Sequence, residues 1–493
     1  MNHSRTSKKS HHRGARRILL ASLAVAALAC GTTAYANDTP ASGTETDTLV
    51  NQIVSNYDHP DRNLVINWEI SNTLPGDGSA IRNGTVNARN ITIDANFNGN
   101  QWTDKGIISE GTTHVTAGEN INVKAHDDAV YTQSNGSIVI DGFKNLIIKA
   151  TGNNWFSIGG YGVVDNGDGI KIQGAEGSTV NISTVAGYQS AIGNSVENPK
   201  LGKGVTINAN EITLDAPRLA IFAGPGKSRD FAVNLNASTV NIKGAIDAAG
   251  GNVSINSDTN GSVTIEKGTW KGSFLAPAVP YSILATGDTG HVTVNKNQGG
   301  LVQITGDVRA DTGASVTING TKEKSFIEGN VLASQGGTLN LKLTGDNSSL
   351  NGNLTTKASS DSSTNAAITA EFSGNNTKFT GDADNVASMG LTFNNGSNWT
   401  GNLKNTSGTS TVGLTNGSSW TGSLTNTSGD STVSLSNGSL WTGDLTNTSG
   451  TTTVNLDGSI WDGAAVSVKF SSVIHLTVDN YYLRGFGLIS ISV

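Results

Sequence analysis

The chain is dominated by short runs in which apolar and polar residues alternate. These runs are rich in Val, Ile, Leu and Thr, and they are bounded by Gly, Asn or Asp. Alternation with a period of two predicts half-buried β-strands, and the bounding residues predict tight turns between them. Because no amphipathic helical pattern comes between the runs, the sequence predicts an all-β protein. Examples lie at residues 64–66, 90–94, 121–123, 137–140, 146–148, 179–182, 205–207, 212–214, 233–235 and 240–242.

The alternation is most regular in residues 379–463, where one phrase is repeated. The pattern Asn-Gly-Ser-x-Trp-Thr-Gly-x-Leu occurs at 395–403, 416–424 and 437–445, and a shortened copy ends at Gly463. The tryptophans of these copies are 21, 21 and 20 residues apart. A propeller blade requires about 40 residues, which is too long for this period. We therefore predict a right-handed parallel β-helix, a solenoid with coils of about 20–25 residues.

A weaker form of the phrase precedes the tryptophan repeats. It reads apolar-x-Gly-Asn/Asp-apolar and begins at Ile304, Ile327, Leu350 and Phe379. Residues one coil apart in a parallel β-helix stack at about 4.8 Å, so the sequence predicts a side-chain ladder. We interpret this ladder as core packing rather than as a carbohydrate-stacking surface, because a Gly follows each Trp in strict register. Its predicted members are Phe379, Trp399, Trp420, Trp441 and Trp461.

Residues 1–36 have the features of an export signal. Basic residues without any acidic residue precede an apolar run at 18–29, which is too short to span a bilayer. Ala34 and Ala36 then offer a small-x-small cleavage site before Asn37. The sequence therefore predicts export of the chain that begins at residue 37.

The composition of the exported chain limits its partners. Removal of residues 1–36 leaves 26 Lys and Arg against 39 Asp and Glu. This acidic balance argues against nucleic acid and anionic membranes as partners, since both require a basic face. Cys30 is the only cysteine, so the exported chain has no disulfide and no thiol chemistry. Two alternatives for the leader stay open, a twin-arginine signal at Arg16-Arg17 and a lipoprotein box that ends at Cys30.

We divide the exported chain into four segments of one continuous solenoid, because each coil contacts only its neighbours. Residues 37–57 form a polar leader or N-terminal cap, and residues 58–378 form irregular coils with loops. Residues 379–463 form the regular Trp-Thr-Gly repeats, and residues 464–493 form a C-terminal cap or a truncated junction to a missing barrel.

The export signal, the cysteine-free Gly/Asn/Thr/Ser-rich β-helix and the terminal repeats together resemble the passenger domain of a Gram-negative autotransporter, of the pertactin and self-associating adhesin kind. The resemblance covers residues 1 to about 480 and is strongest over 379–463. It implies a non-catalytic adhesin or biofilm protein, at the cell surface, in the outer membrane or secreted. The implied partners are a host-surface or bacterial-surface protein or glycan, or further copies of the chain.

The resemblance weakens at the C-terminal end. Autotransporters end in an outer-membrane translocator barrel, and residues 464–493 are too few to form one. Three alternatives follow. The barrel is encoded separately, the chain is exported by another route, or the protein is a truncated, non-functional passenger. Without a barrel partner, the expected location is the periplasm.

The main alternative in another class is a secreted β-helical enzyme that degrades polysaccharides. Such an enzyme places carboxylates from adjacent coils within about 10 Å on one face. The candidates are Asp127, Asp128, Asp165 and Asp168, although Asp-Asp and Asp-Gly are also ordinary turn sequences. The histidines lack metal-site spacing, and residues 165–169 lack the distant Glu of a calcium loop. We therefore expect no catalytic residues, no cofactor and no metal.

Overall fold

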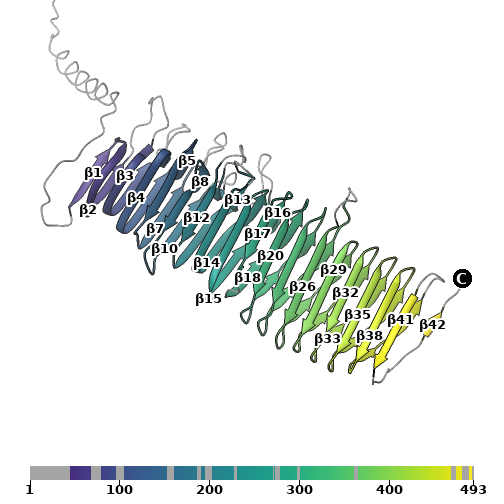
Figure 1. The fold of residues 1–493 in the computed structure, drawn as a ribbon. Coiled ribbons are helices and arrows are strands. Elements are labelled where there is room, and N and C mark those ends of the chain that lie inside the picture. Colours follow the sequence, from purple (N-terminus) through teal and green to yellow (C-terminus); the bar gives the residue numbers. More distant parts are fainter. Residues whose placement is uncertain are drawn as a thin grey trace, which may run out of the picture.

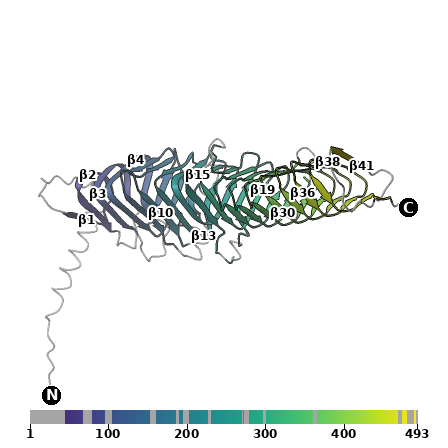
Figure 2. The same ribbon diagram turned by 90° about the horizontal axis from the view of Figure 1, so that it is seen from below.

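Coils of parallel β-strand stack along one axis and form an elongated rod. Strand β1 lies toward one end of this rod and β41 toward the other (Figures 1 and 2). The 42 strands of the described residues belong to a single sheet that winds around the rod. The computed structural model describes residues 45–67, 79–95, 105–152, 160–185, 190–194, 202–226, 230–269, 271, 278–296, 300–359, 365–467, 473–479 and 488–490.

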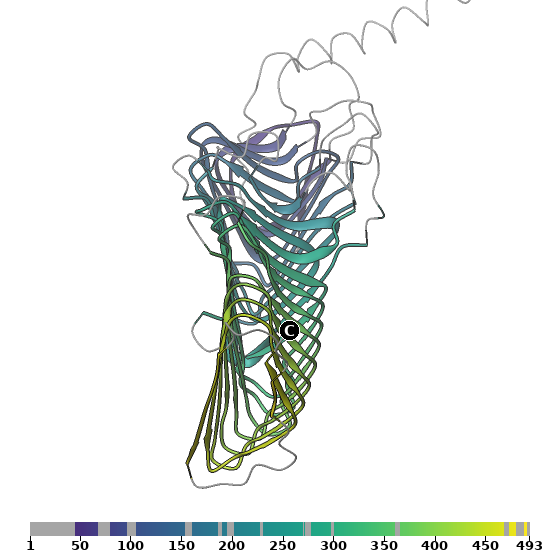
Figure 3. The same ribbon diagram turned by 90° about the vertical axis from the view of Figure 1, so that its right-hand side faces the viewer.

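Each coil crosses three faces of the rod, which we call faces A, B and C. A ladder of parallel strand pairs runs along each face, from β1 to β39 on face A, from β2 to β41 on face B and from β2 to β42 on face C. Figure 3 views the rod from its C-terminal end, and there the coils enclose a narrow interior. Several long strands bend around a corner and contribute to more than one face. These strands are β2 (Val54–Asn67), β3 (Ser79–Ala95), β4 (Lys105–Ala125), β13 (Glu211–Ala223), β14 (Ala232–Ala249) and β15 (Asn252–Glu266).

The other strands each lie on one face. Those on face A are β1 (Thr46–Val50), β7 (Asn145–Ala150), β10 (Thr179–Thr184), β18 (Leu301–Thr305), β21 (Phe326–Glu328), β24 (Ser349–Asn351), β27 (Lys378–Thr380), β30 (Asn398–Thr400), β33 (Ser419–Thr421), β36 (Leu440–Thr442) and β39 (Ile460–Asp462). Those on face B are β6 (Ser137–Asp141), β9 (Ile170–Gln173), β12 (Gly204–Asn208), β17 (His291–Val294), β20 (Ser315–Gly320), β23 (Thr338–Leu343), β26 (Ala367–Ser373), β29 (Ser388–Asn394), β32 (Thr409–Leu414), β35 (Asp430–Ser436), β38 (Thr451–Asp457) and β41 (Val473–Asp479). Those on face C are β5 (Val130–Gln133), β8 (Val163–Asn166), β11 (Ser190–Gly193), β16 (Tyr281–Thr286), β19 (Asp307–Asp311), β22 (Val331–Ala333), β25 (Leu354–Thr356), β28 (Ala383–Asn385), β31 (Leu403–Asn405), β34 (Leu424–Asn426), β37 (Leu445–Asn447), β40 (Ala465–Ser467) and β42 (Leu488–Ser490).

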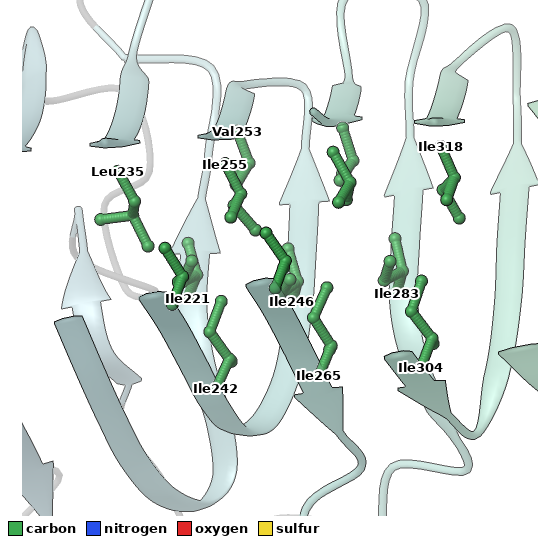
Figure 4. Packing of buried hydrophobic residues seen from close by; sticks show 14 of the residues in the cluster. Ile221, Leu235, Ile242, Ile246, Val253, Ile255, Ile265, Ile283, Ile304 and Ile318 are labelled. Atoms are coloured by element: carbon green, nitrogen blue, oxygen red, sulfur yellow. The ribbon is translucent and has the colours of Figure 1, made fainter. Parts of the chain in front are cut away.

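The alternating sequence pattern places one apolar column of each face inside the rod. On face A, Ile242, Ile265 and Ile304 are paired in register from coil to coil (Figure 4). On face C, Ile246 and Ile283 follow one another in the same way. The columns merge into one continuous core that extends from β2 to β40. Each coil thus buries its apolar side chains against the coils before and after it.

This arrangement is a parallel β-helix-like solenoid, so the predicted fold class is confirmed. The weaker copies of the phrase lie in the same core column as the tryptophans, since Ile304, Ile327, Leu350 and Phe379 pair in succession. The coils stack so closely at the glycine of the repeated phrase that no side chain fits there. Gly401 has a φ of +149°, and a Cβ at this position would lie 1.9 Å from the carbonyl oxygen of Gly381. Any side chain there would therefore separate two coils.

The ends of the chain are only partly described. Ala34, Ala36 and Asn37, the predicted cleavage site, lie outside the described residues. Within the predicted leader or cap at 37–57, residues 46–50 form β1 and residue 54 begins β2. In the part of the chain that the structure describes, no helix has the length and apolar character needed to cross a membrane.

Candidate functional site

The predicted tryptophan ladder lies inside the solenoid on face A. The ring centroids of Trp399, Trp420, Trp441 and Trp461 follow one another at 4.5, 4.7 and 4.7 Å, and neighbouring ring planes differ by 4–5°. Phe379 continues the column, with its centroid 5.4 Å from that of Trp399. All four tryptophans are at most 1% exposed. Since their faces cover one another, these rings do not offer a surface for stacking a sugar.

Each indole also holds the neighbouring coil through a hydrogen bond. Trp420 Nε1 donates to the carbonyl oxygen of Gly401 at 2.9 Å, and Trp441 Nε1 donates to that of Gly422 at 2.9 Å. The same glycines allow the coils to approach closely. The spacing Trp-Thr-Gly therefore links the coils, because the carbonyl of the glycine that follows one Trp accepts the indole hydrogen bond of the next Trp in the ladder.

A second buried ladder was not predicted from the sequence. Asn385, Asn405, Asn426 and Asn447 are at most 1% exposed and stack at the end of successive face C strands. Each Nδ2 donates to the Oδ1 of the next asparagine, at 3.1, 3.2 and 3.1 Å. The signal was present in the Asn-Thr-Ser-Gly copies at 405–408, 426–429 and 447–450. Buried amides that satisfy one another in this way fix the register of the coils.

Asp165, one of the four candidate carboxylates, is fully occupied as a structural group. It is 0% exposed. Its Oδ1 accepts hydrogen bonds from the Thr132 hydroxyl and from the backbone N–H groups of Gly167, at 2.9 Å, and Gly169, at 3.1 Å. Its Oδ2 accepts from the N–H groups of residues 203 and 204, at 2.8 and 2.7 Å. The carboxylate thus joins three successive coils at a corner and has no lone pair left for catalysis.

Each of the other three candidate aspartates has a contact of its own. Asp168 is partly exposed, 3.3 Å from the Lys203 ammonium. Asp127 lies 3.5 Å from Lys105 Nζ, and burial raises its pKa although the ammonium opposes this shift. Asp128 accepts a hydrogen bond from the N–H of residue 161 at 3.2 Å.

The strand register keeps the two predicted pairs of aspartates at opposite ends of face C. Asp165 is paired with Thr132, four positions after Asp128. At about 3.3 Å per residue this offset is about 13 Å, which is beyond the span of a glycosidase pair. The arrangement therefore does not bring Asp127 and Asp128 together with Asp165 and Asp168.

Another cluster of ionisable groups lies on the outer side of face C. The Tyr281 hydroxyl donates to Asp247 Oδ2 at 3.3 Å, and burial raises the pKa of Asp247 to about 6. The Arg309 guanidinium lies 6.0 Å from the Tyr281 ring centroid and contacts Asp307 Oδ2 at 2.8 Å. Burial alone would raise the pKa of Asp307, but hydrogen bonds from Arg309 and Asn330 outweigh it and lower that pKa. A small apolar cluster outside the main core adjoins the site, formed by Leu219, Phe222, Ala245, Ala249 and Val279.

This cluster was missed by sequence reasoning. Asp247, Tyr281 and Arg309 come from successive coils, and they meet because Asp247 pairs with Leu284 and Leu284 pairs with Arg309. The intervals between these residues are unequal, so no fixed period revealed them.

A polar groove of about 500 Å³ lies at the corner after face B. Its side chains include Gln173, Asn208, Asn236 and Asn256. Their amides bind one another from coil to coil at 2.9, 2.9 and 3.0 Å. Because these amides are already paired, the ladder acts mainly as a support of the corner.

The outward side of face B is different, since it carries a column of hydroxyl groups. Thr411, Thr432 and Thr453 are paired in register in β32, β35 and β38. None of these three residues is buried. Thr293 and Thr317 occupy the same column in earlier coils. The structure thus presents one line of hydroxyls along the C-terminal part of the rod.

The described residues contain no group of three or more His, Cys, Asp or Glu side chains that could hold a metal ion. No protein-family model, no curated protein and no solved structure matches this chain.

Proposed function

We propose that the protein is an exported adhesive rod that binds surfaces without catalysis. The observation that carries this proposal is the long polar surface of face B, whose outward positions between β17 and β38 are mostly Thr, Ser, Asn and Gly. Such a surface repeats from coil to coil and offers many weak contacts to an extended partner. The leader at 1–36 supports export, and the acidic balance of the exported chain disfavours nucleic acid. The partner is a protein or glycan of a host or bacterial surface, or a second copy of the rod.

Cell binding tests this proposal. Fluorescent beads coated with residues 37–493 are expected to attach to bacterial or epithelial cells, and soluble rod is expected to compete. Beads coated with an unrelated β-solenoid of similar charge serve as the control. Equal attachment of both bead types would contradict an adhesive function.

A second candidate function is cleavage of polysaccharides, and the Asp247 cluster favours it. Burial raises the pKa of Asp247 to about 6 and the Tyr281 hydroxyl donates to its carboxyl group at 3.3 Å, so Asp247 has the raised pKa that a proton donor requires. In this proposal, Asp247 is the proton donor in place of the four aspartates considered above. Release of new reducing ends from a polysaccharide by the parent chain, and its loss in D247N, would support catalysis. No release by the parent chain on any polysaccharide tested would remove this candidate.

A further inference from the structure

The threonine column of face B has a length and a register that define a binding line. Eight coils in succession contribute one outward residue each, and the pairings place them side by side. The column consists of Thr293, Thr317, Asn340, Thr369, Gly390, Thr411, Thr432 and Thr453. Neighbouring positions are about 4.8 Å apart, since this is the spacing of adjacent strands. The result is a line that runs from coil to coil along the rod, with a hydroxyl and a methyl group at each of its six threonines.

The hydroxyls of this column are free. In the described part of the chain, none of its threonines makes a side-chain hydrogen bond to another residue. Outward ladders elsewhere satisfy themselves, as on face A, where Asn90 Nδ2 donates to Asn63 at 2.8 Å and Asn120 Nδ2 donates to Asn90 at 2.7 Å. A free threonine hydroxyl is both a donor and an acceptor, which matches the hydroxyl of a sugar. The outward asparagines of face A, by contrast, have already used much of their hydrogen-bonding capacity on one another.

The column is also neutral. Its eight residues include no Asp, Glu, Lys, Arg or His, and the next position in register, in β41, is His475. In one flanking column, Lys342 and Glu371 neutralise each other at 3.5 Å, and the other flanking column holds His291 and the exposed Asp430. A column without charged side chains makes no ion pair with a charged polymer. The partner that fits is therefore uncharged.

We propose that this threonine column binds a neutral, extended polysaccharide that lies along the rod axis. The inference rests on the adhesive function proposed above and names its ligand class. Each sugar residue meets one coil, because a pyranose unit in an extended chain has a length close to the strand spacing. Binding is the sum of many weak contacts, so it depends on the number of coils that the chain covers.

Oligosaccharide length provides the first test. Titration calorimetry of residues 37–493 with neutral gluco-oligosaccharides and mannan-oligosaccharides is expected to show an affinity that rises with chain length. The rise ends when the column is covered, at about eight sugar units if one unit meets one strand. An affinity that is already maximal for a disaccharide would overturn the proposal, because it would indicate a compact pocket.

Two substitutions on different faces of the rod provide the matched test. T432K places a charged chain in the middle of the column and is expected to lower the affinity at least tenfold. T421K places the same chain at an exposed position on face A and is expected to leave the affinity unchanged. Circular dichroism and the unfolding midpoint check that both variants fold. Equal binding by T432K and T421K would overturn the assignment of the site.

Gly390 leaves a gap in the threonine column, and a variant that fills this gap should bind more tightly. Gly390 has no atom within 4 Å of the position of a Cβ, so G390T completes the line without a clash. Its affinity for the long oligosaccharide is expected to rise severalfold, and an unchanged affinity would contradict the role of the column.

The remaining outcomes separate the two proposals. If the rod binds cells but no neutral polysaccharide, adhesion stands and this inference fails. If T432K instead abolishes sedimentation of the rod as an oligomer, the column is an interface between copies and the polysaccharide proposal is wrong. If the rod binds neither cells nor polysaccharide, both proposals fail.

Discussion

Removal of one tryptophan from the ladder should loosen the coils that it touches and leave the distant coils unchanged. Trp420 is 0% exposed and stacks on Trp399 at 4.5 Å and on Trp441 at 4.7 Å. Truncation of a buried Trp to Ala costs about 3–5 kcal/mol. The W420A variant also leaves the partly buried carbonyl of Gly401 without its indole partner, which adds about 0.5–1.5 kcal/mol. We therefore expect a large but local loss of stability.

Amide hydrogen exchange measured by mass spectrometry reports this locality. In W420A, exchange of the backbone amides in β30, β33 and β36 should accelerate by several orders of magnitude, while exchange in β3 and β4 should stay as in the parent. A solenoid transmits the change only to neighbouring coils, since each coil contacts only those beside it.

Two controls make the reasoning falsifiable. W420F keeps a stacked ring but loses the indole hydrogen bond and part of the buried ring area, so it should cost about 1–3 kcal/mol, less than W420A. Trp441 also stacks on a Trp on each side, at 4.7 Å from both Trp420 and Trp461, so W441A should cost about as much as W420A. If the backbone amides of W420A exchange no faster than those of T421A, a variant at an exposed position, the ladder does not stabilise these coils and the prediction is wrong.

Three further predictions concern single residues. D165N should destabilise the corner by about 2–4 kcal/mol, because its amide would face N–H groups that now donate to the carboxylate. Urea unfolding measures this loss of stability, and a loss no larger than that of D168N would contradict the prediction. G401A should weaken coil stacking severely, because its Cβ would lie 1.9 Å from the Gly381 carbonyl oxygen. In G413A the new Cβ meets no atom within 4 Å, so this variant should be neutral or more stable by up to about 1 kcal/mol. Similar melting temperatures for the two variants would refute this prediction. Asp247 binds its proton more tightly in the folded chain, with a pKa of about 6 against the usual 3.8, so its contribution to stability is full below pH 3.8 and is lost as the pH rises to about 6. D247N should therefore gain stability over the parent across this range, and unfolding curves that keep the same difference at every pH would exclude this titration.

The sequence alone predicted the solenoid and the members of its ladder. A parallel β-helix stacks equivalent residues, so a period in the sequence is directly a register in space. Trp399, Trp420 and Trp441 could therefore be aligned by counting, and their strands pair at these residues. The weak copies at Ile304 and Ile327 could be found in the same way.

The candidate carboxylates could not be judged by counting. Asp128 and Asp165 are in neighbouring coils, but the offset along face C separates them, and the pairing of Asp165 with Thr132 sets this offset. Asp165 is buried and accepts hydrogen bonds from the Thr132 hydroxyl and from backbone groups of its own and the next coil, which no local pattern indicates. Conversely, the Asp247 cluster joins residues from coils of unequal length.

What the sequence determined by itself was thus the period, the alternation and the glycine positions, because these depend on neighbours in the chain and on the repeat. Only the tertiary structure decided which polar residues meet. That choice depends on where each coil turns its corner, and inserted segments of different length shift this point from one coil to the next. Side chains on a regular column, such as Thr432 and Thr453, follow from the repeat, whereas the pairing of Tyr281 with Asp247 follows from the fold.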